Sequence, residues 1–192
     1  MQWRNSPTGY GVLSIALHWL VALVVFGLFG LGLWMVELDY YSPWRHAAPS
    51  LHKSIGLSLL ALMLLRLLWL FISPPPEPLA SYSRATRLGA KLGHALLYLG
   101  LLALMVAGYL ISTAEGHGIS LFGLFAVPAT LTSIPDQEDV AGVVHQYLAW
   151  GVVLFATLHA LAALKHHFID RDATLLRMLG RAPSPMQDHK ES

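Results

Sequence analysis

The chain has 192 residues, of which 55% are hydrophobic and only 12% are Asp, Glu, Lys or Arg. Soluble domains carry roughly 25% charged residues, so this composition excludes an ordinary water-soluble domain and favours a protein of the lipid bilayer. The net charge is +1, and no basic block indicates nucleic-acid binding. Cysteine is absent, which excludes disulfides, thiolate metal sites and covalently attached c-type haem.

Four apolar segments are each long enough to cross a bilayer, which takes roughly 20 residues. The sequence therefore predicts an all-α fold, a transmembrane four-helix bundle that forms one domain over residues 1–192. The first segment is too long for the core of a signal peptide, so we expect it to remain as a span. The predicted spans cover about residues 12–36, 51–72, 90–111 and 143–164.

Two further segments lie outside these spans. Residues 119–132 are apolar but short and contain Gly123 and Pro128, which predicts an interfacial segment and not a fifth span. The chain turns polar after Leu164, and residues 165–192 are expected to form a cytoplasmic tail. Within this tail, residues 173–179 suit a short surface helix, and the end of the tail is expected to be disordered.

The orientation follows from the basic residues, which favour the cytoplasmic side of a membrane. Nine of the twelve lie on the side that carries both termini, whereas only Arg45 and Lys53 lie on the opposite side. Both termini are therefore expected to be cytoplasmic. The opposite side collects the acidic residues Glu37, Asp39, Glu115, Asp136, Glu138 and Asp139.

Ten residues are histidine, and two of them define two depths in the fourth span. His145 and His159 are 14 residues apart, so they face the same way and lie about 21 Å apart along the helix axis. His18 lies near the inner end of the first span and His52 at the outer end of the second. By depth, His18 pairs with His159 and His52 with His145, an arrangement that suits two haems, each held by two histidines.

The same spacing of 14 residues recurs from the other histidines. It leads from His18 to Gly32 and from His94 to Gly108, and both glycines would let the outer haem pack closely against the backbone. His94 itself has two interpretations. In the first, His94 takes the place of His18 as a ligand of the inner haem. In the second, it contacts a haem propionate or a quinone.

The spacing leads from His52 to Arg66, which is the one charged residue inside a predicted span. A charge within the membrane is costly and therefore indicates function. We assign Arg66 to a propionate of the inner haem or to a quinone headgroup. The alternative is that its side chain extends to the cytoplasmic interface.

Other candidates have weaker signals. Trp19 follows His18 directly and is expected either in the interfacial belt or against a porphyrin. The remaining histidines lie in predicted loops or in the tail and are expected to be solvated, although two of them, His166 and His167, suit proton exchange at the inner face. The full set is His46, His117, His166, His167 and His189.

Several motifs resemble those of the bacterial cytochrome b561 family, and the resemblance covers nearly the whole chain. They are Ile15-Ala-Leu-His18-Trp-Leu, Leu51-His52-Lys-Ser-Ile-Gly56, Arg66-Leu-Leu, Gly93-His94-Ala-Leu-Leu-Tyr98, His145, His159-Ala-Leu-Ala-Ala-Leu-Lys-His-His167 and Asp172-Ala-Thr-Leu-Leu-Arg-Met178. The resemblance implies a protein of the bacterial inner membrane with two b-type haems, one held by His18 and His159 and the other by His52 and His145.

Within this family, some members oxidise periplasmic superoxide and reduce ubiquinone, and others are membrane subunits of hydrogenases and dehydrogenases. This chain departs from the superoxide-oxidising type because its third connection is longer and carries only acidic charges. Such a connection steers an anion poorly. Arg45 and Lys53 near His52 would still form a local positive entrance.

Three functions are consistent with these features. The first is electron transfer between the ubiquinone pool and a periplasmic donor or acceptor, with superoxide as one candidate. The second is a non-catalytic membrane anchor that passes electrons for a separate dehydrogenase or a periplasmic partner protein, with residues 112–144 as its docking surface. The third is a histidine-lined metal transporter without haem.

Overall fold

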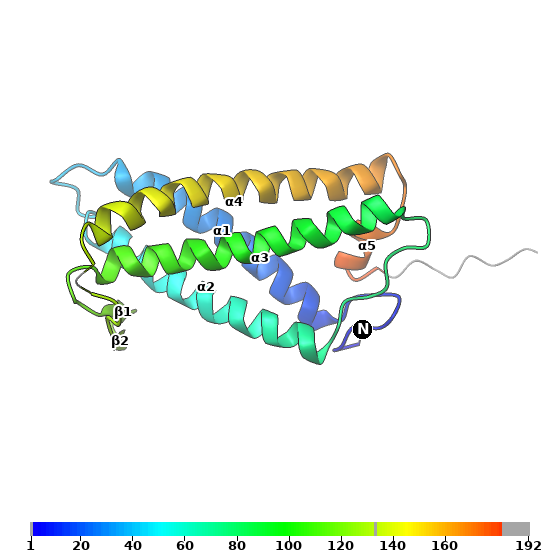
Figure 1. Cartoon of the computed structure of the whole chain (residues 1–192), viewed down its shortest axis with the longest axis horizontal. Coiled ribbons are helices and arrows are strands. Elements are labelled where there is room, and N and C mark those ends of the chain that lie inside the picture. Colours follow the sequence, from blue (N-terminus) through cyan, green and yellow to red (C-terminus); the bar gives the residue numbers. More distant parts are fainter. Residues whose placement is uncertain (1, 133, 182–192) are drawn as a thin grey trace, which may run out of the picture.

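A computed structural model describes residues 2–132 and 134–181. In these residues four long helices run alternately up and down in a bundle (Figure 1). Each helix is long and apolar enough to cross a membrane, so the predicted four-span bundle is confirmed. The helices are α1 (Val12–Val36), α2 (Ala47–Ile72), α3 (Arg84–Thr113) and α4 (Gln137–Phe168).

The outer surface of the bundle is apolar. Leu23, Leu99 and Leu154 expose 70%, 64% and 63% of their surface. In water such a surface would drive aggregation, but hydrocarbon tails cover it without cost. The bundle is therefore surrounded by lipid.

Three helices extend beyond their apolar segments. α2 starts at Ala47 and includes Pro49 in its first turn, where proline fits because no backbone donor is needed there. α3 starts after Ser83, whose side chain accepts a hydrogen bond from the Thr86 backbone nitrogen. α4 carries acidic residues in its first turn and basic residues in its last, which matches the helix dipole.

The buried core lies at mid-length of the bundle and draws on all four helices. In α4 it contains Val152, which is equidistant in sequence from His145 and His159. In each of the other three helices, the histidine comes before the core residues along the chain. The core comprises Val21, Val25, Leu59, Met63, Leu101, Met105 and Val152. This apolar layer therefore separates two groups of histidines.

The two ends of the bundle differ in the elements that lie beside them. The α5 end is where α1 and α3 begin and where the short helix α5 (Thr174–Met178) lies (Figure 1). The hairpin end is the opposite one. The predicted helix at residues 173–179 is thus confirmed as α5. The expected disordered end of the tail, with His189, lies outside the described residues.

A β-hairpin occupies part of the segment that was expected to be interfacial. Strand β1 (Ile119–Leu121) pairs antiparallel with β2 (Phe125–Val127). The turn between them uses left-handed backbone at Phe122 and Gly123. The hairpin is fastened to α2, because the Ser54 hydroxyl donates to the Ser120 carbonyl at 3.2 Å and accepts from the Phe122 nitrogen at 3.1 Å. The hairpin is an addition to the predicted all-helical fold.

Candidate functional site

The histidines at the hairpin end form a facing pair across the bundle. His52 of α2 and His145 of α4 have ring centres 6.3 Å apart. The Nδ1 atom of His145 lies 2.9 Å from the Leu104 carbonyl oxygen of α3. A carbonyl only accepts, so Nδ1 donates and the lone pair of Nε2 is free to bind a metal. The His52 Nδ1 atom is buried and has no hydrogen-bond partner among the described residues.

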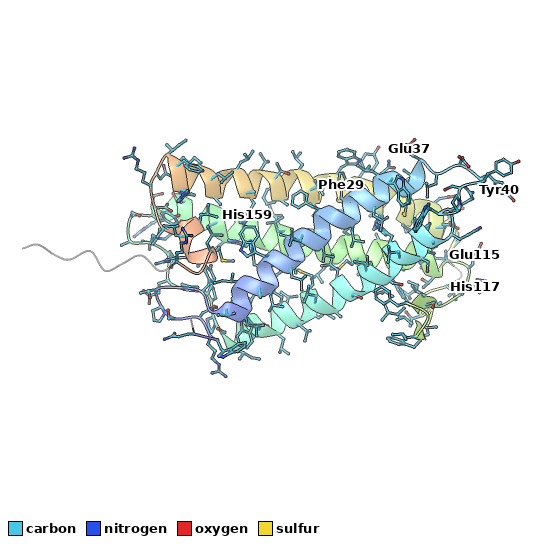
Figure 2. The ribbon with its side chains drawn as sticks, turned by 180° about the vertical axis from the view of Figure 1, so that it is seen from behind. Phe29, Glu37, Tyr40, Glu115, His117 and His159 are labelled. Atoms are coloured by element: carbon cyan, nitrogen blue, oxygen red, sulfur yellow. The ribbon has the colours of Figure 1, made fainter. Side chains whose placement is uncertain are left out.

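Three histidines meet at the α5 end. His18 of α1 and His159 of α4 have ring centres 6.3 Å apart, the same separation as in the other pair. His94 of α3 also approaches His159, with ring centres 5.2 Å apart. The His94 Nδ1 atom lies 2.8 Å from the Ala90 carbonyl oxygen of its own helix. Figure 2 shows His159 between the helices near this end. Both pairs expected from depth are thus neighbours in space.

The two candidate glycines lie directly against the histidines of the hairpin end. A Cβ atom on Gly32 would come within 3.4 Å of the His52 Cε1 atom, and one on Gly108 within 2.9 Å of the His145 Cε1 atom. The second distance is shorter than any ordinary carbon contact. Gly108 therefore leaves the space that the His145 ring occupies.

A cavity of about 480 Å³ lies between the helices at the hairpin end. Its lining is mostly aliphatic and aromatic, and it includes His52, His145, Gly32 and Gly108. An apolar cavity with a few convergent polar groups is typical of a cofactor site. The cavity therefore suits a large, flat, mainly apolar group that the two histidines bind from opposite sides.

A smaller cavity of about 290 Å³ adjoins the first one and is lined by cationic side chains. Arg45 and Lys53, which the sequence indicated as a positive entrance, both line it. His46, expected to be a solvated loop residue, lines it as well. Four residues line both cavities, namely Pro49, Lys53, Ser112 and Ile119. The polar cavity is therefore the approach to the apolar one from the hairpin end.

Arg66 contacts a histidine. Its Nη2 atom lies 3.1 Å from the His18 Nδ1 atom, and its guanidinium carbon lies 5.3 Å from the centre of the Tyr98 ring. A guanidinium only donates, so in this arrangement His18 Nδ1 accepts. The contact places a positive charge beside the histidines of the α5 end.

The remaining histidines have separate environments. His117 is exposed at the hairpin end, near Glu115 (Figure 2). His166 is mostly buried and pairs with Asp170 and Asp172 at 2.8 and 3.0 Å. The expectation that His166 is solvated is therefore wrong, because the turn after α4 folds two carboxylates back onto its ring.

Sequence reasoning missed a group at the α5 end. Trp19, next to His18, donates through Nε1 to the Met178 carbonyl oxygen at 2.9 Å. Arg177 of α5 donates through Nη1 to the Glu77 carbonyl oxygen at 2.9 Å. Burial raises the pKa of the Tyr10 hydroxyl, while the charges of Arg177 and Arg66 act to lower it by less. No sequence spacing links these residues, because they come from separate loops and helices.

Four membrane-length helices that bring two pairs of histidines face to face, one of them beside an apolar cavity, are an arrangement by which helical bundles hold haem. Fold and site thus define the class of membrane cytochromes. A family profile described as "Prokaryotic cytochrome b561" matches residues 9–181. The chain belongs to the prokaryotic cytochrome b561 family. Membership implies b-type haem binding and electron transport and, with the four apolar helices, fits a protein of the inner membrane.

The chain is similar to several known proteins along almost its full length. It is 56% identical to "Cytochrome b561 homolog 2" of Escherichia coli over 184 aligned residues, and this alignment covers 96% of this chain and 98% of the relative. It is 34% identical over 175 residues to "Probable superoxide oxidase CybB" of Yersinia pestis, with 88% and 95% covered. It is 30% identical over 182 residues to "Cytochrome b562" of Cereibacter sphaeroides, with 91% and 98% covered.

Proposed function

We propose that the chain carries two b-type haems and transfers electrons between ubiquinone and a small donor or acceptor on the periplasmic side of the membrane. The observation that carries this proposal is the presence of two histidine pairs with equal ring separations of 6.3 Å on opposite sides of the core. In the proposed orientation the α5 end faces the cytoplasm, in line with its basic residues. The whole chain acts as one domain, because one core joins all four helices.

The residues fit the haem that they are proposed to hold. Two imidazoles that bind one metal ion from opposite sides through bonds of about 2 Å have ring centres about 6 Å apart. The separation of 6.3 Å in each pair meets this requirement. The 5.2 Å between His94 and His159 falls short of it. This comparison favours His18 over His94 as the second ligand at the α5 end.

The haem would supply one-electron chemistry, and the chain determines what reaches it. An iron with two histidine ligands has no free position for a substrate, so a donor must pass its electron from a neighbouring position. The cavity with Arg45, His46 and Lys53 supplies that position beside His52. Its positive charge favours an anionic donor. Superoxide is such an anion, and the similar protein from Yersinia pestis is described as a probable superoxide oxidase.

Reconstituted protein tests this function directly. Purified chain in liposomes with ubiquinone is mixed with superoxide in a stopped-flow instrument, and haem reduction and quinol formation are followed. We expect two haems for each chain and quinol formation that requires His52. Quinol formation that is unchanged in His52→Ala would contradict the proposed route.

The hairpin supports a second candidate, that of an anchor that passes electrons for another protein. Its tip exposes Phe122, Leu124 and Phe125, and Leu124 exposes 80% of its surface. Exposed apolar side chains of this kind are typical of docking surfaces. Purification with a stoichiometric partner, together with no quinol formation by the isolated chain, would favour this function over the first.

A further inference from the structure

Helix α5 lies against the histidines of the α5 end. The hydrogen bond from Trp19 to the Met178 carbonyl ties α5 to α1, and the ring of Trp19 lies 5.3 Å from that of His18. The bond from Arg177 to the Glu77 carbonyl ties α5 to the connection between α2 and α3. Arg177 is therefore held in place close to the proposed haem ligands.

Arg177 and Arg66 are two cations that have no carboxylate partner in the described part of the chain. The Arg177 Nε atom is buried without a hydrogen-bond partner among residues 2–132 and 134–181. Over the same residues, neither arginine has a carboxylate oxygen within the 4.0 Å of an ion pair. Both lie at the same side of His18, because Arg66 contacts its ring, and Met178, the residue after Arg177, accepts a hydrogen bond from the adjacent Trp19. A partly buried cation without a counter-charge is costly, so the arrangement calls for an anion at this place.

The hydrogen bonding of His18 points to the same conclusion. A histidine that binds a metal through Nε2 carries its proton on Nδ1, which then donates and no longer accepts. Arg66 would then need another acceptor close to its present one at His18 Nδ1. A carboxylate is the acceptor that matches a guanidinium best, because its two oxygens accept two parallel hydrogen bonds.

We propose that Arg177 and Arg66 together bind the carboxylate groups of the haem that His18 and His159 would hold. The inference rests on the proposed function and adds to it a positioning role for α5. The two guanidinium groups come from different helices, so α5 would supply one of the two partners of the carboxylate groups. Both positive charges would also favour the reduced state of the haem iron. Reduction lowers the charge of the iron by one and so weakens its repulsion from the two arginines.

The test is a redox titration of the purified full-length chain with its haems. Arg177→Gln removes the charge but can still donate to the Glu77 carbonyl, and Arg177→Lys keeps the charge. Arg181→Gln is the matched control, because Arg181 is an exposed arginine four residues further on. The haem that is lost in His18→Ala identifies which midpoint belongs to the α5 end.

We expect Arg177→Gln to shift the midpoint of the α5-end haem to a more negative potential and to leave the other midpoint unchanged. Arg177→Lys should shift it less, and Arg181→Gln should leave both midpoints unchanged. An unchanged midpoint in Arg177→Gln, or an equal shift of both haems, would overturn the inference. Purified wild-type chain without two b-type haems would instead contradict the proposed function.

A lipid phosphate is the other source of an anion at this place. The titration is therefore repeated in nanodiscs of phosphatidylcholine and of phosphatidylglycerol. The shift caused by Arg177→Gln should be the same in both lipids if the anion is a haem carboxylate. A shift that occurs only in phosphatidylglycerol would assign Arg177 to a lipid headgroup and would overturn the inference.

Discussion

His145 donates a hydrogen bond from Nδ1 to the Leu104 carbonyl oxygen at 2.9 Å, and this bond joins α4 to α3. It fixes the ring at the wall of the cavity and leaves Nε2 free for the metal that the proposed function places there. His52, its partner across the cavity, has no such bond among the described residues. The hairpin-end site thus combines one histidine held by a neighbouring helix with one held mainly by packing.

Replacement of either histidine at the hairpin end should remove one haem and spare the other. His52→Ala and His145→Ala each take away one of the two proposed axial ligands, and a b-type haem has no covalent bond to keep it in place. We expect the ratio of haem to protein to fall from about two to about one, as measured by the pyridine haemochrome spectrum.

The matched control for these variants is His117→Ala, because His117 is a histidine at the same end with 82% of its side chain exposed. It should keep both haems. Loss of both haems in His52→Ala with a folded protein would contradict the assignment of separate pairs.

A side chain at Gly108 should displace the His145 ring. The Cβ of Gly108→Val would meet the His145 Cε1 atom at 2.9 Å, and overpacking of this kind costs roughly 1–3 kcal/mol. We expect a lower melting temperature and partial loss of the hairpin-end haem, measured by thermal unfolding and by haem content. Gly32→Ala, with a Cβ contact of 3.4 Å, should have a smaller effect.

Gly30→Val is the control for crowding, since a Cβ atom there meets nothing within 4 Å. It changes backbone freedom in a helix as Gly108→Val does. Equal haem loss in the two variants would show that crowding against His145 is not the cause.

Charge reversal in the cationic cavity should slow the reaction with an anionic donor. Lys53→Glu replaces attraction by repulsion beside His52, and electrostatic steering of this kind changes association rates by about tenfold or more. The measurement is the second-order rate of haem reduction by superoxide in the stopped-flow instrument.

Two controls test whether the slower rate comes from the charge at residue 53: added salt, and the same substitution at a lysine far from the cavity. Added salt should reduce the difference between Lys53→Glu and the wild type, because it screens exposed charges. Lys91→Glu changes the same charge in α3 near the α5 end and should leave the rate unchanged. A rate in Lys53→Glu equal to that of the wild type at low salt would contradict entry through this cavity.

Acid should weaken the attachment of α5 through Asp172. Burial acts to raise the pKa of this carboxyl, but hydrogen bonds from Thr174 and Tyr82 and the charge of His166 outweigh it, so the pKa lies below its ordinary value of 3.8. A group with a lowered pKa in the folded state stabilises the fold above its unfolded-state pKa, and this contribution is lost as the pH falls through the folded-state pKa.

The measurement is the melting temperature of the wild type and of Asp172→Asn between neutral pH and about pH 2. The wild type should melt at a higher temperature at neutral pH, and the difference should disappear in acid. A difference that is independent of pH would show that the Asp172 charge does not fasten α5. Glu37→Gln, at an exposed acid that follows the end of α1 at the hairpin end, is the control and should not reproduce the acid dependence.

The sequence was sufficient to predict the spans and the two layers of histidines. A membrane span requires an apolar run of nearly fixed length, so the spans can be found in the sequence. In a straight helix, the 14-residue spacing places His145 and His159 on the same face. The ends of the helices were not predictable from hydropathy, since hydropathy marks the part that lies in lipid and not where the helix hydrogen bonds stop. Pro49 lies inside α2, for instance, although proline usually ends a helix.

The other features required tertiary structure. The hairpin has strands of only three residues, too short for an alternating pattern. Its place depends on the buried hydroxyl of Ser54, which is 66 residues away from Ser120. Arg177 was counted only as a cytoplasmic charge because nothing in its local sequence links it to Arg66. Contacts of this kind arise when separate helices pack, and no local propensity encodes them.

The connection between α3 and α4 is fastened by a few polar side chains: Ser54 holds the hairpin, and the Tyr109 hydroxyl donates to the Pro128 carbonyl and accepts from the Thr130 nitrogen. The four helices pack through their own core, whereas the hairpin bonds to α2 at one buried serine, two residues beyond His52. Chimeras that carry a different hairpin but retain Ser54 would therefore keep both histidine pairs. Under the proposed function, such chimeras would change the cavity beside His52, which the hairpin residues Ile119 and Ser120 help to line, and would leave the core between the two histidine pairs unchanged.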